Sequence, residues 1–103
     1  MKKAKVLVCD LYAADLEEVV KGKQYRVVYR EGYEGPSISL MMPLNQRIYV
    51  FDRFPPFFEG LLPEGPMLEA LLKRAKIDAD DYLEQLIRVG GELVGNVNVE
   101  RGS

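Results

Sequence analysis

The stretch Phe54-Pro55-Pro56-Phe57-Phe58-Glu59-Gly60-Leu61-Leu62-Pro63-Glu64-Gly65-Pro66-Met67 divides the sequence into two parts of different character. It holds three Phe, two Leu and a Met within fourteen residues, yet its four Pro and two Gly prevent a long helix or strand. A small domain has difficulty burying so many apolar side chains. The stretch is therefore either a connection that seals the core or a rigid apolar surface, part of which docks another protein.

The residues before this stretch favour β-strands. Residues 5–9 form a short apolar run that suits a buried strand, and residues 25–30 and 47–51 are rich in aromatic and β-branched side chains. Cys9 ends the first run, so we expect it to be a small buried hydrophobe in a reducing compartment. Residues 40–44 are also apolar, but Pro43 argues against a central strand there.

Residues 13–20 allow two interpretations. Their local propensity mildly favours one or two helical turns. Their short span between two predicted strands would equally suit the returning arm of a hairpin.

Two helices and a closing strand are expected after the proline-rich stretch. Pro66 suits the first position of a helix, because the N–H that it lacks is not needed there. The apolar residues that follow form one stripe at helical spacing, namely Leu68, Leu71, Leu72 and Ala75. Asp78 is predicted to cap a second helix that stops at Gly90 and Gly91 and carries Tyr82, Leu83, Leu86 and Ile87 on one face.

Residues 93–99 then alternate in the manner of a strand with one wetter face, with Leu93, Gly95, Val97 and Val99 against Val94, Asn96 and Asn98. Strands, then two helices, then a strand predict an α+β fold in which a small antiparallel sheet carries two helices packed on one face. The length suits a single domain over residues 1–103.

The composition excludes several kinds of chemistry. The chain holds no His, no Trp and one Cys, which removes His-based metal sites, Ser–His and Cys–His pairs and internal disulfides. The acidic cluster of Asp78, Asp80 and Asp81 lacks the spacing and glycine of a calcium loop, so we interpret it as the negative first turn of a helix. We predict no catalytic, cofactor or metal site and therefore no enzyme.

The charge and hydropathy also restrict the partners. The net charge is −2 and the pI is about 5.2, which does not favour nucleic acid. The basic excess in the first thirty residues is interpreted as solvated strand edges, with a weak phosphate-contacting patch as the alternative. No apolar run approaches the roughly 20 residues that span a bilayer, so we expect a cytoplasmic protein that does not bind membranes.

Three blocks resemble a known family. Residues 58–65, F-E-G-L-L-P-E-G, resemble the F-x-N-L-L-P-[DE]-[GS] signature of the N-terminal subdomain of HipA-type serine/threonine kinases. Residues 37–44 are similar to its S-x-S-L-x-x-P-L, and residues 82–97 resemble its F-x-L-L-x-x-x-G-x-D-x-x-G-A-V ending. The likeness runs over residues 4–100, with Gly60 in place of Asn and the acidic position displaced to Glu92. It favours a strand for residues 13–20.

The resemblance implies a function through a partner. HipA-type kinases carry their ATP-binding and catalytic residues after this subdomain, and none is present here. The chain therefore resembles the subdomain as a free-standing protein, as in the HipS-like antitoxins of three-component HipBST toxin–antitoxin modules. There the small protein binds and silences a shortened HipA-like (HipT-type) kinase, and a HipB-like helix-turn-helix protein in the same complex binds DNA.

The same resemblance implies which residues bind the kinase. Residues 57–67 would reach toward its active-site cleft, anchored in their own core by Phe58 and Leu61. The predicted partner-binding residues are Phe57, Leu62, Pro63, Glu64, Pro66 and Met67. The alternative is a scaffold subunit that completes an active split HipA-type kinase, because in the fused proteins this subdomain is part of a working enzyme.

Overall fold

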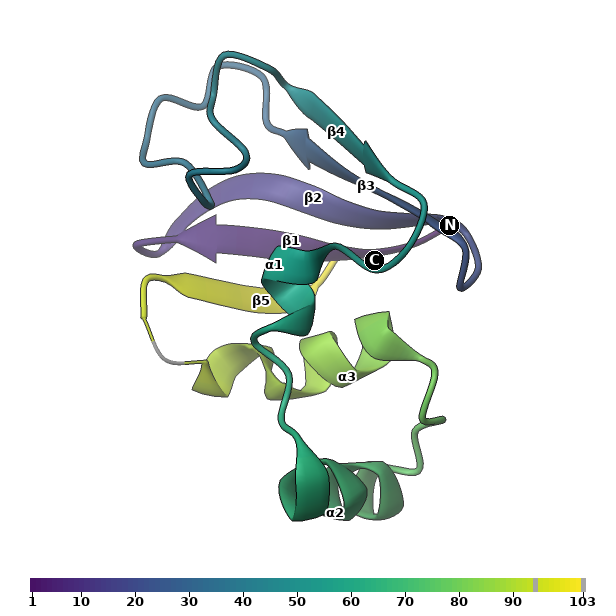
Figure 1. The fold of residues 1–103 in the computed structure, drawn as a ribbon. Coiled ribbons are helices and arrows are strands. Elements are labelled where there is room, and N and C mark those ends of the chain that lie inside the picture. The colour runs from purple at the N-terminus through teal and green to yellow at the C-terminus, as the bar shows by residue number, and fades with distance from the viewer. Residues whose placement is uncertain (94, 103) are drawn as a thin grey trace.

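The computed structural model describes residues 1–93 and 95–102 and shows one five-stranded antiparallel sheet (Figure 1). The strands stand in the order β4-β3-β2-β1-β5. Their bounds are β1 Lys2–Val8, β2 Leu11–Val20, β3 Gln24–Tyr29, β4 Ile48–Phe51 and β5 Val97–Arg101. The ambiguous residues 13–20 lie in a strand, as the family resemblance favours and against their mild helical propensity. Residues 40–44 form turns rather than a strand, as Pro43 predicts.

The helices lie on one side of the sheet (Figure 1). They are α1 Pro56–Glu59, α2 Gly65–Ala75 and α3 Tyr82–Val89, followed by the 3-10 turn η1 Gly90–Glu92. The α+β class with an antiparallel sheet is confirmed, with the short α1 as an addition to the two expected helices. α3 contacts β1 and β5, whereas α2 lies beyond α3 as seen from the sheet (Figure 1).

The core lies between the inner face of the sheet and the helices. Alternate residues of the strands point inward and are buried, and Phe58 of α1 and Leu83 and Leu86 of α3 cover them. The strand residues that form this inner face are Ala4, Val6, Val8, Ala14, Leu16, Tyr25, Val27, Tyr29, Val97 and Val99. Among the described residues, no helix is long and apolar enough to cross a membrane.

The expectation that Cys9 is buried is wrong. Val8 pairs with Leu11, so Cys9 and Asp10 form the two-residue turn between β1 and β2. Both have positive φ, 51° and 66°, which is the conformation that a two-residue hairpin turn of type I′ requires. The apolar run therefore ends one residue earlier than predicted, and the Cys9 side chain is exposed.

The predicted cap of the second helix is also wrong. α3 begins at Tyr82, and the Asp81 carboxylate, rather than that of Asp78, accepts the Glu84 N–H at 3.2 Å. Asp78 lies in the preceding turn, where its backbone carbonyl accepts from the buried side-chain amide of Gln85 at 3.1 Å. The sequence offers several aspartates in succession, and only the position of the first helical turn selects among them.

Charged side chains fasten α3 to the two neighbouring strands. The Lys2 ammonium lies 3.3 Å from Asp81 and 3.4 Å from Glu84, and Arg101 of β5 pairs with Glu84. Burial alone would raise the pKa of Glu84, but its bonds to Arg101 and Lys2 lower that pKa below its ordinary value. The carboxylate therefore stays ionised, joining α3 to β1 and β5.

The closing strand is shorter than predicted. β5 begins at Val97, where Val97 and Val99 point inward and Asn98 is half-buried, as the alternation predicts. The predicted first residue, Leu93, instead follows η1 and packs partly against the core, and Val94 lies outside the described residues. Gly90, at the end of α3, approaches β5 so closely that a Cβ there would lie 1.8 Å from the Val99 carbonyl oxygen.

The close approach of Gly90 to β5 leads to a prediction about stability. Gly90→Ala should force α3 away from β5 and lower the free energy of unfolding by about 1–3 kcal/mol, the usual cost of overpacking a core. Urea denaturation measures the change. Gly91→Ala is the matched control, because a Cβ at that position would meet no atom within 4 Å beyond its neighbours along the chain. Equal stability of the two variants would contradict the packing that we describe.

Candidate partner-binding surface

The 57–67 segment, which contains every partner-binding residue predicted from the sequence, is held by consecutive backbone turns. The N–H groups of Phe58 and Glu59 donate to the Pro55 carbonyl, both at 3.0 Å. Leu61 then donates to Phe58 at 3.0 Å, and Leu62 to Glu59 at 3.1 Å. These bonds and the flanking prolines leave the segment few alternative conformations.

The inner residues of the segment attach it to the core. Phe58 is buried, and Leu61 packs partly against the core, as expected for anchors. Phe57 and Leu62, which the sequence assigns to partner binding, are also half-buried against the core. The Phe57 ring stands edge-on to Phe58 at a centroid distance of 5.2 Å. These two residues have a structural role whether or not they touch a partner.

The outer residues of the segment face solvent. Glu64 and Pro66 are exposed, and Met67, in the first turn of α2, is 74% exposed. Pro63 is half-buried. Pro63 and Met67 border a shallow hollow of about 390 Å³, whose other lining residues are Gly60, Leu61, Leu71, Arg74, Val89 and Leu93. Four of the six predicted residues thus lie at a surface that a partner could reach.

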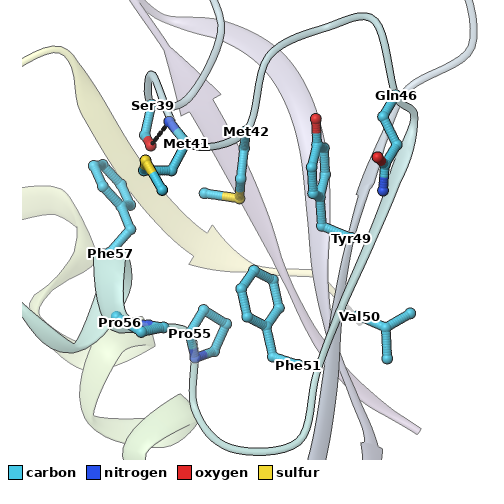
Figure 2. A pocket seen from close by; sticks show the side chains of 10 residues that line it. All are labelled: Ser39, Met41, Met42, Gln46, Tyr49, Val50, Phe51, Pro55, Pro56 and Phe57. Carbon is cyan, nitrogen blue, oxygen red and sulfur yellow. Dashed lines mark hydrogen bonds between the residues drawn. The ribbon is translucent and has the colours of Figure 1, made fainter.

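A second apolar surface lies beside the segment, and the sequence did not assign it to a site. It is a groove of about 570 Å³ between the loop before β4 and the residues of α1 (Figure 2). We call it the Met41 groove; its lining residues are Ser39, Met41, Met42, Gln46, Tyr49, Val50, Phe51, Pro55, Pro56 and Phe57. Phe57 belongs to this groove and not to the hollow beside Met67, so the structure divides the predicted set between two surfaces.

The polar groups around the Met41 groove are occupied by neighbouring backbone. The Ser39 hydroxyl accepts the Met41 N–H at 3.0 Å (Figure 2). The Gln46 amide donates to the Ile48 carbonyl at 2.6 Å, and the Tyr49 hydroxyl donates to the Pro43 carbonyl at 2.6 Å. The groove therefore suits an apolar side chain of a partner better than a polar or charged ligand.

One tyrosine hydroxyl shapes the rim of this groove. Tyr29 of β3 accepts the Ile38 N–H at 2.8 Å and donates to the Met42 carbonyl at 2.6 Å. Burial raises the pKa of Tyr29, while the bond from Ile38 acts in the opposite direction. Ile38 and Met42 are thereby held in the core. At the tip of the loop between them, Leu40 and Met41 are 95% and 84% exposed.

Sequence reasoning missed Leu40 and Met41 although a usable signal was present. Pro43 excludes residues 40–44 from a central strand, so their apolar side chains lack a regular element that would bury them. Apolar residues in a short loop between strands are candidates for exposure. Which of them face solvent depends on the Tyr29 hydrogen bonds, which join positions 9 and 13 residues apart.

The model of the HipA N-terminal domain family matches residues 4–100. This chain belongs to the HipA N-terminal domain family. The match is to that domain and not to the kinase catalytic part of HipA proteins, and it is consistent with a toxin–antitoxin context.

Two relatives of this HipA N-terminal domain illustrate the likeness. An uncharacterized protein of Haemophilus influenzae is 29% identical over 72 residues, which cover 70% of this chain and 68% of that protein. The solved structure of the N-terminal domain of HipA toxin is similar with a TM-score of 0.76 at 23% identity, covering 100% of this chain and 94% of that one. The second likeness shows that the two share a fold.

The Tyr29 bonds predict a stability difference. Tyr29→Phe leaves the Ile38 N–H and the Met42 carbonyl without their partner and should cost about 1–3 kcal/mol. Tyr33→Phe removes a hydroxyl whose bond to the Pro36 carbonyl is exposed, and should change stability by less than about 0.5 kcal/mol. Thermal unfolding of both variants checks this, and a larger cost at Tyr33 would contradict the role assigned to Tyr29.

A charged substitution should affect stability differently on the two sides of the 57–67 segment. Met67→Asp should leave the free energy of unfolding within about 0.5 kcal/mol of the original, because the side chain is exposed. Leu62→Asp should lower it by about 2 kcal/mol or more, because Leu62 packs against the core. Urea denaturation distinguishes them. A strongly destabilised Met67→Asp would show that Met67 is needed for folding and is not free to bind.

Proposed function

We propose that this HipA N-terminal domain is a non-catalytic antitoxin subunit that binds a HipA-like (HipT-type) serine/threonine kinase and inhibits it. The observation that carries the proposal is the outer side of the 57–67 segment. Its apolar Met67 is 74% exposed at the end of a segment anchored by the buried Phe58, in a chain of the HipA N-terminal domain family.

The stiffness of the segment supports a binding role. Binding orders flexible loops at a cost in conformational entropy, and a loop already fixed by turns and prolines avoids most of that cost. Met is also a side chain that adapts to apolar pockets of different shape. Met67, Pro66 and the half-buried Pro63 would form the apolar contact.

A charged contact would set the orientation of the 57–67 segment in the complex. Glu64 is exposed immediately before α2, next to the apolar residues of the segment. In the proposed complex its carboxylate pairs with a basic residue of the kinase cleft, which would orient the segment more than it would strengthen binding. The complex would also hold a HipB-like helix-turn-helix protein, which would supply the contact with DNA.

The alternative function is that of a scaffold subunit that completes an active split HipA-type kinase. It is favoured by the name of the similar solved structure, the N-terminal domain of HipA toxin, in which the domain is described as part of the toxin itself. The two functions use the same partner and the same surface. They differ in whether kinase activity falls or rises on binding.

The proposal predicts that Met67→Asp weakens kinase binding at least about tenfold, because a carboxylate would replace the apolar contact at the centre of the interface. The chain is co-expressed with a HipA-like (HipT-type) kinase, and affinity is measured on the purified proteins by calorimetry. Leu11→Asp is the matched control, since Leu11 is also exposed but lies on β2. Unchanged affinity of a folded Met67→Asp would refute the assigned surface.

Kinase activity then separates the two functions. As an antitoxin, the chain should lower phosphorylation by the purified kinase and restore growth to cells that express it, and Met67→Asp should lose both effects. As a scaffold, the chain should raise phosphorylation. Absence of any complex with such kinases would reject both functions.

A further inference from the structure

The strand β4 ends the sheet with an unusual edge. It pairs with β3 on one side, and within residues 1–93 and 95–102 no strand pairs with its other side (Figure 1). All four of its residues are apolar: Ile48, Tyr49, Val50 and Phe51. The opposite edge strand, β5, carries Glu100 and Arg101. Charged residues on edge strands normally prevent pairing with other chains, and β4 lacks them.

The outer face of the sheet emphasises the difference. In the two rows of paired residues that reach β4, the residues of β5, β1 and β2 carry charges of alternating sign, β3 contributes Arg26 and Val28, and both residues of β4 are exposed and aliphatic. One row of paired residues runs Glu100, Lys5, Asp15, Val28 and Ile48, and the next runs Lys3, Glu17, Arg26 and Val50. Ile48 and Val50 are 44% and 62% exposed.

The backbone groups of β4 that face away from β3 belong to the same two residues, Ile48 and Val50. The Tyr29 N–H donates to the Arg47 carbonyl at 2.9 Å, so the residues of β4 bonded to β3 alternate from Arg47 onward. Ile48 and Val50 fall between them, and their N–H and C=O groups point away from β3. In agreement with this, the Ile48 carbonyl accepts its bond from the side chain of Gln46 and not from β3.

We infer that β4 pairs with β4 of a second copy of this chain, antiparallel and about a two-fold axis at Tyr49, so that two sheets join into one. Self-pairing is isologous, as in most homodimers. The inference does not depend on the proposed function.

Backbone geometry and side chains together select this register. An antiparallel pair that continues a sheet places outward-bonding residues opposite outward-bonding residues, which here are Ile48 and Val50. With the axis at Tyr49, Ile48 of each copy lies opposite Val50 of the other. The exposed aliphatic side chains of both copies then cover one another on the outer face. The Ile48 N–H and both backbone groups of Val50 gain a partner, and the Ile48 carbonyl, which has two lone pairs, accepts a second bond beside the one from Gln46.

The polar residues that flank β4 agree with the same register. The axis at Tyr49 sets Gln46 opposite Asp52 of the second copy, where the side-chain amide can donate to the carboxylate. Two neighbouring registers also keep outward-bonding residues opposite one another. The axis at Val50 sets Arg47 opposite Arg53, two like charges, and the axis at Ile48 sets Gln46 opposite Val50, away from Asp52. Residues 46–52, Q-R-I-Y-V-F-D, are thus self-complementary about Tyr49.

Sedimentation equilibrium of the purified chain tests the inference. A short strand pair is a small interface, so we expect a reversible dimer with a Kd on the order of 100 µM. Val50→Lys, which places a charge on the edge, should weaken dimerisation at least about tenfold. Leu40→Lys is the matched control, because Leu40 is a still more exposed apolar residue that lies off the edge, and it should leave the Kd unchanged.

A second set of variants tests the register. Gln46→Glu opposes the Asp52 carboxylate of the second copy and should weaken the dimer. Adding Asp52→Lys to Gln46→Glu creates an opposite-charge pair and should restore it. Both positions are exposed, so the variants should fold normally. Failure of the second change to restore dimerisation would reject the axis at Tyr49.

Two results would overturn the inference as a whole. One is a chain that stays monomeric up to about 1 mM, a concentration at which weak pairing is visible. The other is a dimer that Val50→Lys leaves intact, because its interface would then lie elsewhere. In the first case, a loss of kinase affinity in Val50→Lys would assign the edge to the kinase. Because dimerisation is measured without any kinase, its failure leaves the proposed function standing.

Discussion

The burial of Phe58 is the interaction on which the arrangement depends. Its ring lies in the same core as Leu83 and Leu86 of α3 and the inward residues of the sheet, so it joins the strand half of the chain to the helical half. Because Phe58 is fixed in the core, the turns and prolines that follow it set the position at which α2 begins. Without this anchor the exposed Met67 would belong to a mobile loop, and binding it would carry the entropy cost of ordering that loop.

The buried hydroxyl of Tyr29 acts in the same way on the other side of the core. It fixes Ile38 and Met42 inward, so that Leu40 and Met41 are displayed outward beside the groove. The chain thus presents apolar side chains at three places: the 57–67 segment, the Met41 groove and the β4 edge. The first and second share α1 as a boundary, and the second and third share β4. Exposed apolar patches are typical of interaction sites, and the proposed contacts with other chains rest on these three surfaces.

The candidate site could be predicted only in part. The proline-rich stretch and its resemblance to a family identified the 57–67 segment, and Phe58 was correctly separated from it as an anchor. Phe57 and Leu62 were assigned to the partner although they also pack against the core. Composition identifies an apolar residue in a loop, but its exposure depends on contacts with residues distant in sequence. The same reason explains why Leu40, Met41 and the β4 edge were not recognised.

Local alternation, helical spacing and short motifs were enough to predict most of the strands, the two main helices and the family, and residues 13–20 were assigned to a strand only through the family resemblance. Element ends were less certain where local signals compete, as with the aspartates before α3 and the hairpin turn at Cys9. Which strand lies at the free edge, and which apolar side chains remain in solvent, follows from the folded arrangement alone. Strand order and exposure result from pairing between distant segments, and a residue's own chemistry does not specify its neighbours.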